Sequence, residues 1–163
     1  MANQTARTLA FYFLNEQQKW CSVSNSSVLS RKKYIILAPL KRNLLELDGP
    51  ITILPMENYV EGPWLYKRNG QYYNVYASMG QTLETISYAV APTVQGPWTF
   101  AGELMPEEAD SFTIHPGIID YKGKSYLFYH NTSLSLDGYG PATGRRSICF
   151  TEISYDENGR IVR

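Results

Sequence analysis

The sequence has 163 residues and balances 15 basic residues against 15 acidic ones, so its formal charge at pH 7 is zero. This length suits one domain, and we expect the whole chain to fold as one. Neutrality argues against nucleic acid and against an anionic membrane surface as partners, because both favour a basic excess.

The start of the chain is its least regular part. Residues 1–33 match no other stretch of the sequence, although 8–24 could form a hairpin. A strand is expected at 34–39, "YIILAP". The apolar segment 9–14 is too short for a signal-peptide core, and no run reaches membrane-spanning length. We therefore expect no membrane association and favour a cytoplasmic location.

A strand and a turn follow, and both recur later in the chain. The turn at Asn69-Gly70 precedes an aromatic strand in "YKRNGQYYNVYA", residues 66–77. The pattern returns as "YKGKSYLFYH" at 121–130, with the two turn glycines 53 residues apart (123 − 70 = 53).

A second motif repeats out of phase with the first. The strand "YIILAP" at 34–39 resembles "YAVAP" at 88–92, and their prolines are also 53 residues apart (92 − 39 = 53). A third, partial copy is "SICFTEISYDENGRIV" at 147–162. The chain is therefore built from a repeated unit of strands and turns.

A repeat of this length with four short strands is typical of a β-propeller blade. We predict an all-β fold, a partial β-propeller with about two and a half to three blades of four-stranded antiparallel sheet. An irregular start and partial blade would occupy 1–58, with blades at 59–112 and 113–163. A sandwich or a barrel remains an alternative, because the period is seen only two or three times.

The repeat also places two functional side chains together. Glu61 and His115 are 54 residues apart (115 − 61 = 54), so they hold nearly the same place in consecutive blades. Both would open the innermost strand of a blade, where side chains converge on the propeller axis. An acid and an imidazole in equivalent axial positions indicate a site.

Three motifs resemble one known family. They are "ENYVEGPWLYKRNGQYYNVYAS", "TIHPGIIDYKGKSYLFYHN" and "GRRSICFTEISYDENGRI". They resemble glycoside hydrolase family 43, the five-bladed propeller enzymes of hemicellulose breakdown that include β-xylosidases and α-L-arabinofuranosidases. The resemblance runs from about residue 40 to 163, does not include 1–33, and implies the C-terminal half of the catalytic domain.

The resemblance implies roles for three residues. Glu61 matches the general acid, which protonates the departing glycosidic oxygen. His115 matches the central histidine, which lies beneath the sugar and contacts a hydrated cation, often calcium. Arg146, rather than its neighbour Arg145, matches the arginine that reaches the sugar. No cofactor is required in this interpretation, and Ca²⁺ would lie near His115 through waters.

Two aromatic residues are further candidates for the sugar site. The rings of Trp64 and Tyr139 could stack on the sugar. The expected reaction is inverting hydrolysis of terminal xylose or arabinofuranose units. It needs a protonated acid with a raised pKa and an ionised carboxylate about 6.5–9.5 Å away. Glu61, between Val60 and Trp64, could be desolvated enough to be that acid.

The second carboxylate is not found in the sequence. The family's base belongs to earlier blades, and the aspartates here lie in turns or at the blade junction. An alternative to a truncated enzyme is therefore an inactive propeller fragment with at most weak sugar binding. A third alternative is a general interaction module. Open blade flanks would expose apolar surface, so we expect a homo-oligomer that covers them and an oligosaccharide as substrate.

Overall fold

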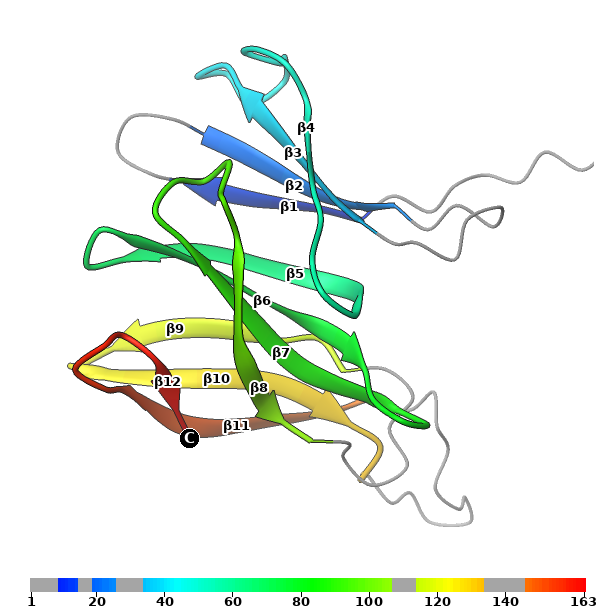
Figure 1. Ribbon diagram of the computed structural model, residues 1–163, viewed down its shortest axis with the longest axis vertical. Coiled ribbons are helices and arrows are strands. Elements are labelled where there is room, and N and C mark those ends of the chain that lie inside the picture. Colours follow the sequence, from blue (N-terminus) through cyan, green and yellow to red (C-terminus); the bar gives the residue numbers. More distant parts are fainter. Residues whose placement is uncertain (1–8, 15–18, 26–33, 107–113, 134–145) are drawn as a thin grey trace, which may run out of the picture.

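The computed structural model describes residues 9–14, 19–25, 34–106, 114–133 and 146–163 (Figure 1). Their strands form three four-stranded antiparallel sheets, each a simple meander of consecutive strands. The first sheet contains β1 (Leu9–Leu14), β2 (Lys19–Asn25), β3 (Tyr34–Leu40) and β4 (Thr52–Leu54). The second contains β5 (Tyr59–Arg68), β6 (Gln71–Met79), β7 (Glu84–Ala91) and β8 (Thr99–Met105). The third contains β9 (Gly117–Tyr121), β10 (Lys124–Asn131), β11 (Ser147–Tyr155) and β12 (Ile161–Val162).

This architecture confirms the predicted all-β partial propeller. The expected hairpin near the start is present, because β1 and β2 pair antiparallel from Leu9 opposite Ser24 to Leu14 opposite Lys19. It continues through β3 and β4, so the irregular-looking start of the sequence belongs to a four-stranded sheet of its own. Within the described ranges, no helix is long and apolar enough to cross a membrane.

The predicted turns occupy equivalent places in the second and third sheets. Asn69 and Gly70 connect β5 to β6 with φ of 48° and 82°. Lys122 and Gly123 connect β9 to β10 with φ of 49° and 78°. Two consecutive residues with positive φ make the tight turn that suits the twist of a hairpin. The 53-residue sequence repeat is therefore a repeat of hairpins.

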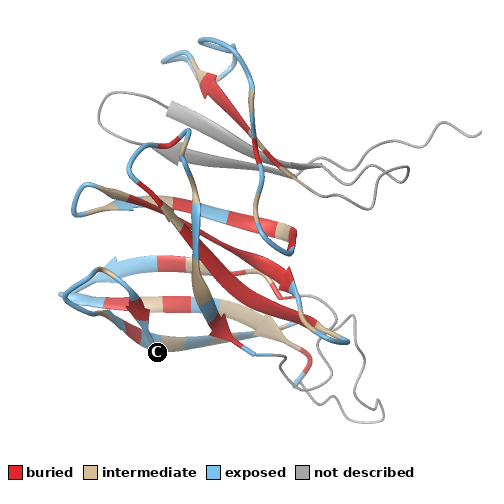
Figure 2. Ribbon diagram, in the orientation of Figure 1, coloured by how far each residue is buried: buried red, intermediate tan, exposed pale blue. Residues whose placement is uncertain are grey.

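The central strand β6 buries both of its faces (Figure 2). Successive side chains of a strand point to opposite faces, so Tyr73 and Val75 point one way and Tyr72 and Tyr76 the other. The first pair belongs to a core cluster shared with the third sheet, which contributes residues such as Leu127. The second pair belongs to a cluster shared with the first sheet. Two hydrophobic cores thus join three sheets.

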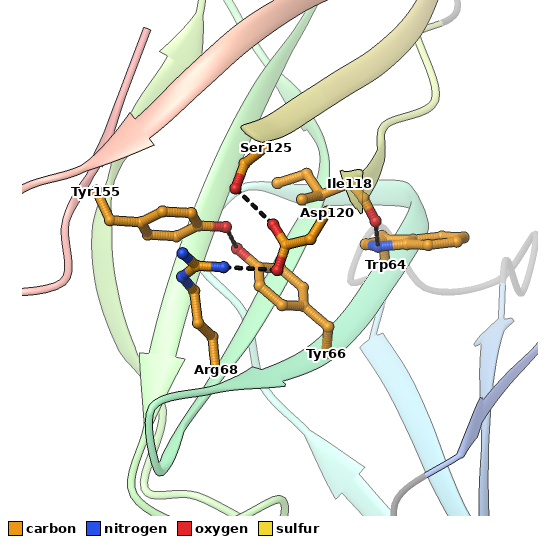
Figure 3. A network of polar contacts seen from close by, with 7 residues as sticks. All are labelled: Trp64, Tyr66, Arg68, Ile118, Asp120, Ser125 and Tyr155. Atoms are coloured by element: carbon orange, nitrogen blue, oxygen red, sulfur yellow. Dashed lines mark hydrogen bonds and ion pairs between the residues drawn. The ribbon is translucent and has the colours of Figure 1, made fainter. Parts of the chain in front are cut away.

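A polar network joins the second and third sheets at one end (Figure 3). Arg68 Nη1 lies 2.6 Å from Asp120 Oδ2, whose other oxygen accepts a hydrogen bond from Ser125. The Arg68 guanidinium also lies 4.2 Å from the centre of the Tyr155 ring. The hydroxyl groups of Tyr66 and Tyr155 are 2.9 Å apart. Burial raises the pKa of Tyr66, so this hydroxyl remains protonated and its hydrogen bond is kept.

One face of the third sheet exposes several large apolar side chains. We call it the outer face, and it carries Ile119, Tyr121, Phe128, Ile148 and Phe150. Ile148 is 86% exposed and Phe150 is 64% exposed, which is unusual for large apolar side chains on a strand. The rings of Phe128 and Phe150 stack with centroids 5.6 Å apart. Among the described residues, nothing shields this face as the second sheet shields the other one.

Candidate functional site

The structure brings Glu61 and His115 into direct contact. Glu61 Oε1 lies 2.9 Å from His115 Nε2, although the two residues are 54 positions apart in the sequence. Glu61 lies near the start of β5, and His115 lies just before β9. Their side chains are 35% and 22% exposed, so the pair is sheltered and still reachable from solvent. The pairing that the sequence repeat predicted is present.

The backbone around Glu61 departs from regular strand geometry. The pairing of β5 with β6 shifts register on both sides of Glu61, between Tyr59 and Glu61 and again before Trp64. Such an irregularity redirects a side chain that a regular strand would point elsewhere. Gly62 takes a φ of 61°, in the left-handed region that favours glycine. The Glu-Gly-Pro sequence therefore aims the carboxyl group of Glu61.

Gly62 also makes room for the imidazole. A Cβ atom at this position would lie 3.0 Å from Cγ and 3.1 Å from Cδ2 of His115. The ring of His115 therefore packs directly on the backbone of residue 62. Any side chain there would displace the imidazole from Glu61.

A buried carboxylate holds the segment that leads into His115. Glu84, at the start of β7, is 5% exposed, and its Oε2 accepts a hydrogen bond of 3.1 Å from the backbone N–H of Ile114. Ile114 itself is fully buried in the core between the second and third sheets. The backbone beside His115 is therefore fixed by both a hydrogen bond and packing.

A second histidine, which the sequence reasoning missed, lies beside this pair. The rings of His130 and His115 are 5.5 Å apart between centroids. Both ring nitrogens of His130 are buried and lack a hydrogen-bond partner among the described residues. Burial, helped by the charges of Arg146 and His115, lowers the pKa of His130 to about 4. The signal was available, because the chain has two histidines and His130 takes the repeat position of Ala77 (130 − 77 = 53).

Arg146 lies at the same end of the third sheet. It directly precedes β11, whose first residue, Ser147, pairs with Asn131 next to His130. Its side chain is exposed, and its charge is one of the influences on His130. The structure thus places Arg146 in the neighbourhood of the two histidines. Arg145 lies outside the described residues.

Of the two aromatic candidates, Trp64 lies among the described residues. Trp64 lies on β5 with its indole N–H donating a 3.1 Å hydrogen bond to the carbonyl of Ile118 (Figure 3). Its ring approaches Gly117 and it is 37% exposed. This bond gives Trp64 a part in joining the second and third sheets, and its stacking on a sugar stays a prediction. Tyr139 lies outside the described residues.

The arrangement suits proton transfer to a ligand from one side. The Glu61–His115 hydrogen bond can form in two ways: the ring N–H donates to a carboxylate, or a protonated carboxyl donates to a bare Nε2. A second carboxylate would be needed for inverting hydrolysis. Asp120, a described aspartate, is held by Arg68 and Ser125 in the network away from this pair. The described part of the chain contains no cluster of three metal-ligating side chains.

Comparisons with known proteins point to one family. The chain is 36% identical over 116 residues to a β-xylosidase from Xylanibacter ruminicola, covering 71% of this chain and 34% of that protein. It is 35% identical over 124 residues to a xylosidase/arabinosidase from Bacteroides ovatus, covering 73% and 35%. A crystal structure of a GH43 β-xylosidase/α-arabinofuranosidase from a compost microbial metagenome, solved with xylotriose, superposes with a TM-score of 0.78. That pair shares 23% identity and covers 94% of this chain and 56% of the other.

The sequence model of glycosyl hydrolases family 43 matches residues 10–159. The prediction that the resemblance excludes the first 33 residues is therefore wrong for 10–33, where β1 and β2 lie. Strand patterns there are too degenerate to show the match by eye. The chain spans about a third of the length of the two curated relatives it matches here. The chain belongs to glycosyl hydrolases family 43.

Proposed function

We propose that the chain forms part of an inverting glycoside hydrolase that acts on terminal xylose or arabinofuranose units, with Glu61 as its general acid. The observation that carries this proposal is the Glu61–His115 pair, held 2.9 Å apart on consecutive sheets by the bulge at Gly62. The names of the relatives, β-xylosidase and xylosidase/arabinosidase, support the substrate class. So does the xylotriose in the structural neighbour.

The proposed reaction uses two carboxyl groups, one as general acid and one as general base. Glu61 gives its proton to the glycosidic oxygen as the bond from that oxygen to the anomeric carbon breaks. A water, deprotonated by a second carboxylate, attacks the same carbon from the opposite face. His115 holds the Glu61 carboxyl in place, and the cationic side chain of Arg146 contacts sugar oxygens. The second carboxylate lies outside the described residues or on another chain.

An inactive fragment with weak sugar binding is the second candidate. The observation that favours it is that the described aspartates Asp120 and Asp156 are engaged in local contacts, the first with Arg68 and Ser125 and the second in the turn after β11. The carboxylate of Asp120 is paired with Arg68 in the polar network at one end of the second and third sheets. A carboxyl group without a partner base can bind a sugar hydroxyl and cannot complete inverting hydrolysis.

A hydrated calcium ion near His115 stays a prediction of the family resemblance. Ca²⁺ takes six to eight oxygen ligands. Among the described residues no three metal-ligating side chains come together, and Nε2 of His115 is already hydrogen-bonded to Glu61. This arrangement does not fit direct ligation of Ca²⁺, so we assign no step of the reaction to a cation.

We further propose that a second copy of the chain covers the outer face of the third sheet. The large exposed apolar side chains there, Ile148 and Phe150 above all, support association. We expect a dimer in light scattering coupled to gel filtration, and a monomer after the double change Ile148→Lys and Phe150→Glu. Glu157→Lys, in an exposed turn away from this face, is the control and should leave the mass unchanged. A monomer for the unaltered chain over a hundredfold concentration range contradicts the proposal.

Turnover and sugar binding together test the proposed function. We expect the chain to hydrolyse 4-nitrophenyl β-D-xylopyranoside or 4-nitrophenyl α-L-arabinofuranoside, and to bind xylotriose in calorimetry. Arg146→Ala should weaken xylotriose binding about tenfold, the loss of one charge-assisted hydrogen bond. Binding without turnover supports the inactive fragment. Neither binding nor turnover in the folded chain rejects both candidates and leaves an interaction module.

A further inference from the structure

We propose that His130 is a substrate-binding residue whose imidazole hydrogen-bonds a hydroxyl group of the sugar held against Glu61 and His115. The inference rests on the proposed function, because it requires a sugar in this place. It assigns to His130 a contact that the sequence motifs did not suggest.

The two ring nitrogens of His130 are buried without a described partner. Removing a polar group from water costs free energy unless another group replaces the lost hydrogen bonds. Most buried polar atoms in folded proteins are paired, so each exception calls for an explanation. A ligand hydroxyl is one explanation, and the position of His130 beside His115 favours it.

Two of the neighbours of His130 on its own sheet are apolar. Its cross-strand partner on β11 is Ile148, and Phe128 precedes it by two positions on the same face. Neither of these side chains can satisfy an imidazole. Packing alone would favour an aliphatic or aromatic residue at this position. Packing therefore does not explain why position 130 is a histidine.

The chemistry of the ring fits a sugar hydroxyl. A neutral imidazole has one N–H donor and one acceptor nitrogen, and a hydroxyl can serve as partner to either. Because the pKa of His130 is lowered to about 4, the ring keeps both functions across neutral pH. A neutral donor also adds no further positive charge beside Arg146. The described geometry thus gives one neutral and one cationic contact for the same sugar.

The test separates binding from stability. We expect His130→Phe to weaken xylotriose binding about tenfold in calorimetry, the effect of one lost hydrogen bond. The same change should leave the melting temperature unchanged or raise it, because it removes two buried polar atoms that have no partner among the described residues. His130→Gln and His130→Asn each retain a donor near one ring nitrogen, and one of them should recover part of the affinity. Glu157→Gln, in the exposed turn after β11, is the control and should bind as the unaltered chain does.

A second measurement follows the histidine rings of the unaltered chain and uses a variant only to assign the signals. The chain has two histidines, so a ¹⁵N correlation spectrum of the imidazoles contains two sets of signals, and His130→Phe assigns them. Addition of xylotriose should change the ¹⁵N chemical shifts of the His130 ring. Binding by the unaltered chain that leaves these signals and the His130→Phe affinity unchanged overturns the assignment. A lower melting temperature for His130→Phe with full affinity does so as well. If the unaltered chain binds no xylotriose, the proposed function fails first, and the inference with it.

Discussion

Replacing Glu61 with glutamine is expected to lower hydrolysis of xylobiose by about 10²–10⁴-fold, the usual contribution of a general acid. Glutamine keeps the shape of the side chain and can still hydrogen-bond His115. Its amide is not acidic enough to transfer a proton to the glycosidic oxygen. Glu57→Gln makes the same chemical change at an exposed position four residues earlier and should leave the rate unchanged. The measurement is kcat/KM of the three proteins prepared side by side.

The choice of substrate identifies the role of Glu61. A nitrophenolate leaves readily without being protonated, whereas the sugar leaving group of xylobiose needs a proton. Glu61→Gln should therefore slow the nitrophenyl glycoside much less than xylobiose. Equal losses on both substrates would assign Glu61 to another step, such as activation of water. An unaltered rate on xylobiose would remove it from the mechanism.

Gly62→Ala is expected to cost about 2–5 kcal/mol of unfolding free energy and to abolish sugar binding. The left-handed backbone costs a non-glycine residue about 1–2 kcal/mol. The added Cβ would also press on the His115 ring at 3.0 Å, and overpacking of this kind costs about 1–3 kcal/mol. Chemical denaturation measures the loss of unfolding free energy, and xylotriose calorimetry measures the loss of sugar binding.

The hairpin of β5 and β6 supplies a matched control for this change. Gly70 also has a positive φ, 82°, and a Cβ there would meet nothing within 4 Å. Gly70→Ala should therefore report the backbone strain alone, about 1–2 kcal/mol, with sugar binding retained. Equal destabilisation by the two substitutions, with binding kept in both, would show that His115 does not depend on the space above Gly62.

The repeat made much of the fold predictable from sequence. Turn residues fix hairpins by their backbone preferences, so Asn69-Gly70 and Lys122-Gly123 could be recognised directly. The matching positions of Glu61 and His115 then predicted that they share a site, and the structure places them in contact. The first sheet was harder to recognise because β1 and β2 share no such turn signal with the other sheets. Their strands show only a generic apolar pattern.

The missed part of the site depends on packing between strands. The repeat aligns His130 with Ala77, but only the structure shows that its ring nitrogens lie beside His115 and have no hydrogen-bond partner among the described residues. Trp64 shows the opposite case. Its motif suggests a sugar-stacking ring, and the structure gives its N–H to Ile118 of the neighbouring sheet. Partners across a sheet interface cannot be read from a single strand.

The burial of both faces of β6 has a consequence for motion. Hydrogen exchange is slowest where a strand is covered on all sides and faster where one face is open. The amides of β6 should therefore exchange slowest, and those of β11, with its exposed outer face, should exchange earlier. Glu61 lies on β5, which pairs with β6, whereas His130 and Arg146 belong to the more open third sheet. Glu61 is therefore attached to the sheet whose amides exchange slowly. His130 and Arg146, the residues proposed to hold the sugar, belong to the sheet whose amides exchange earlier.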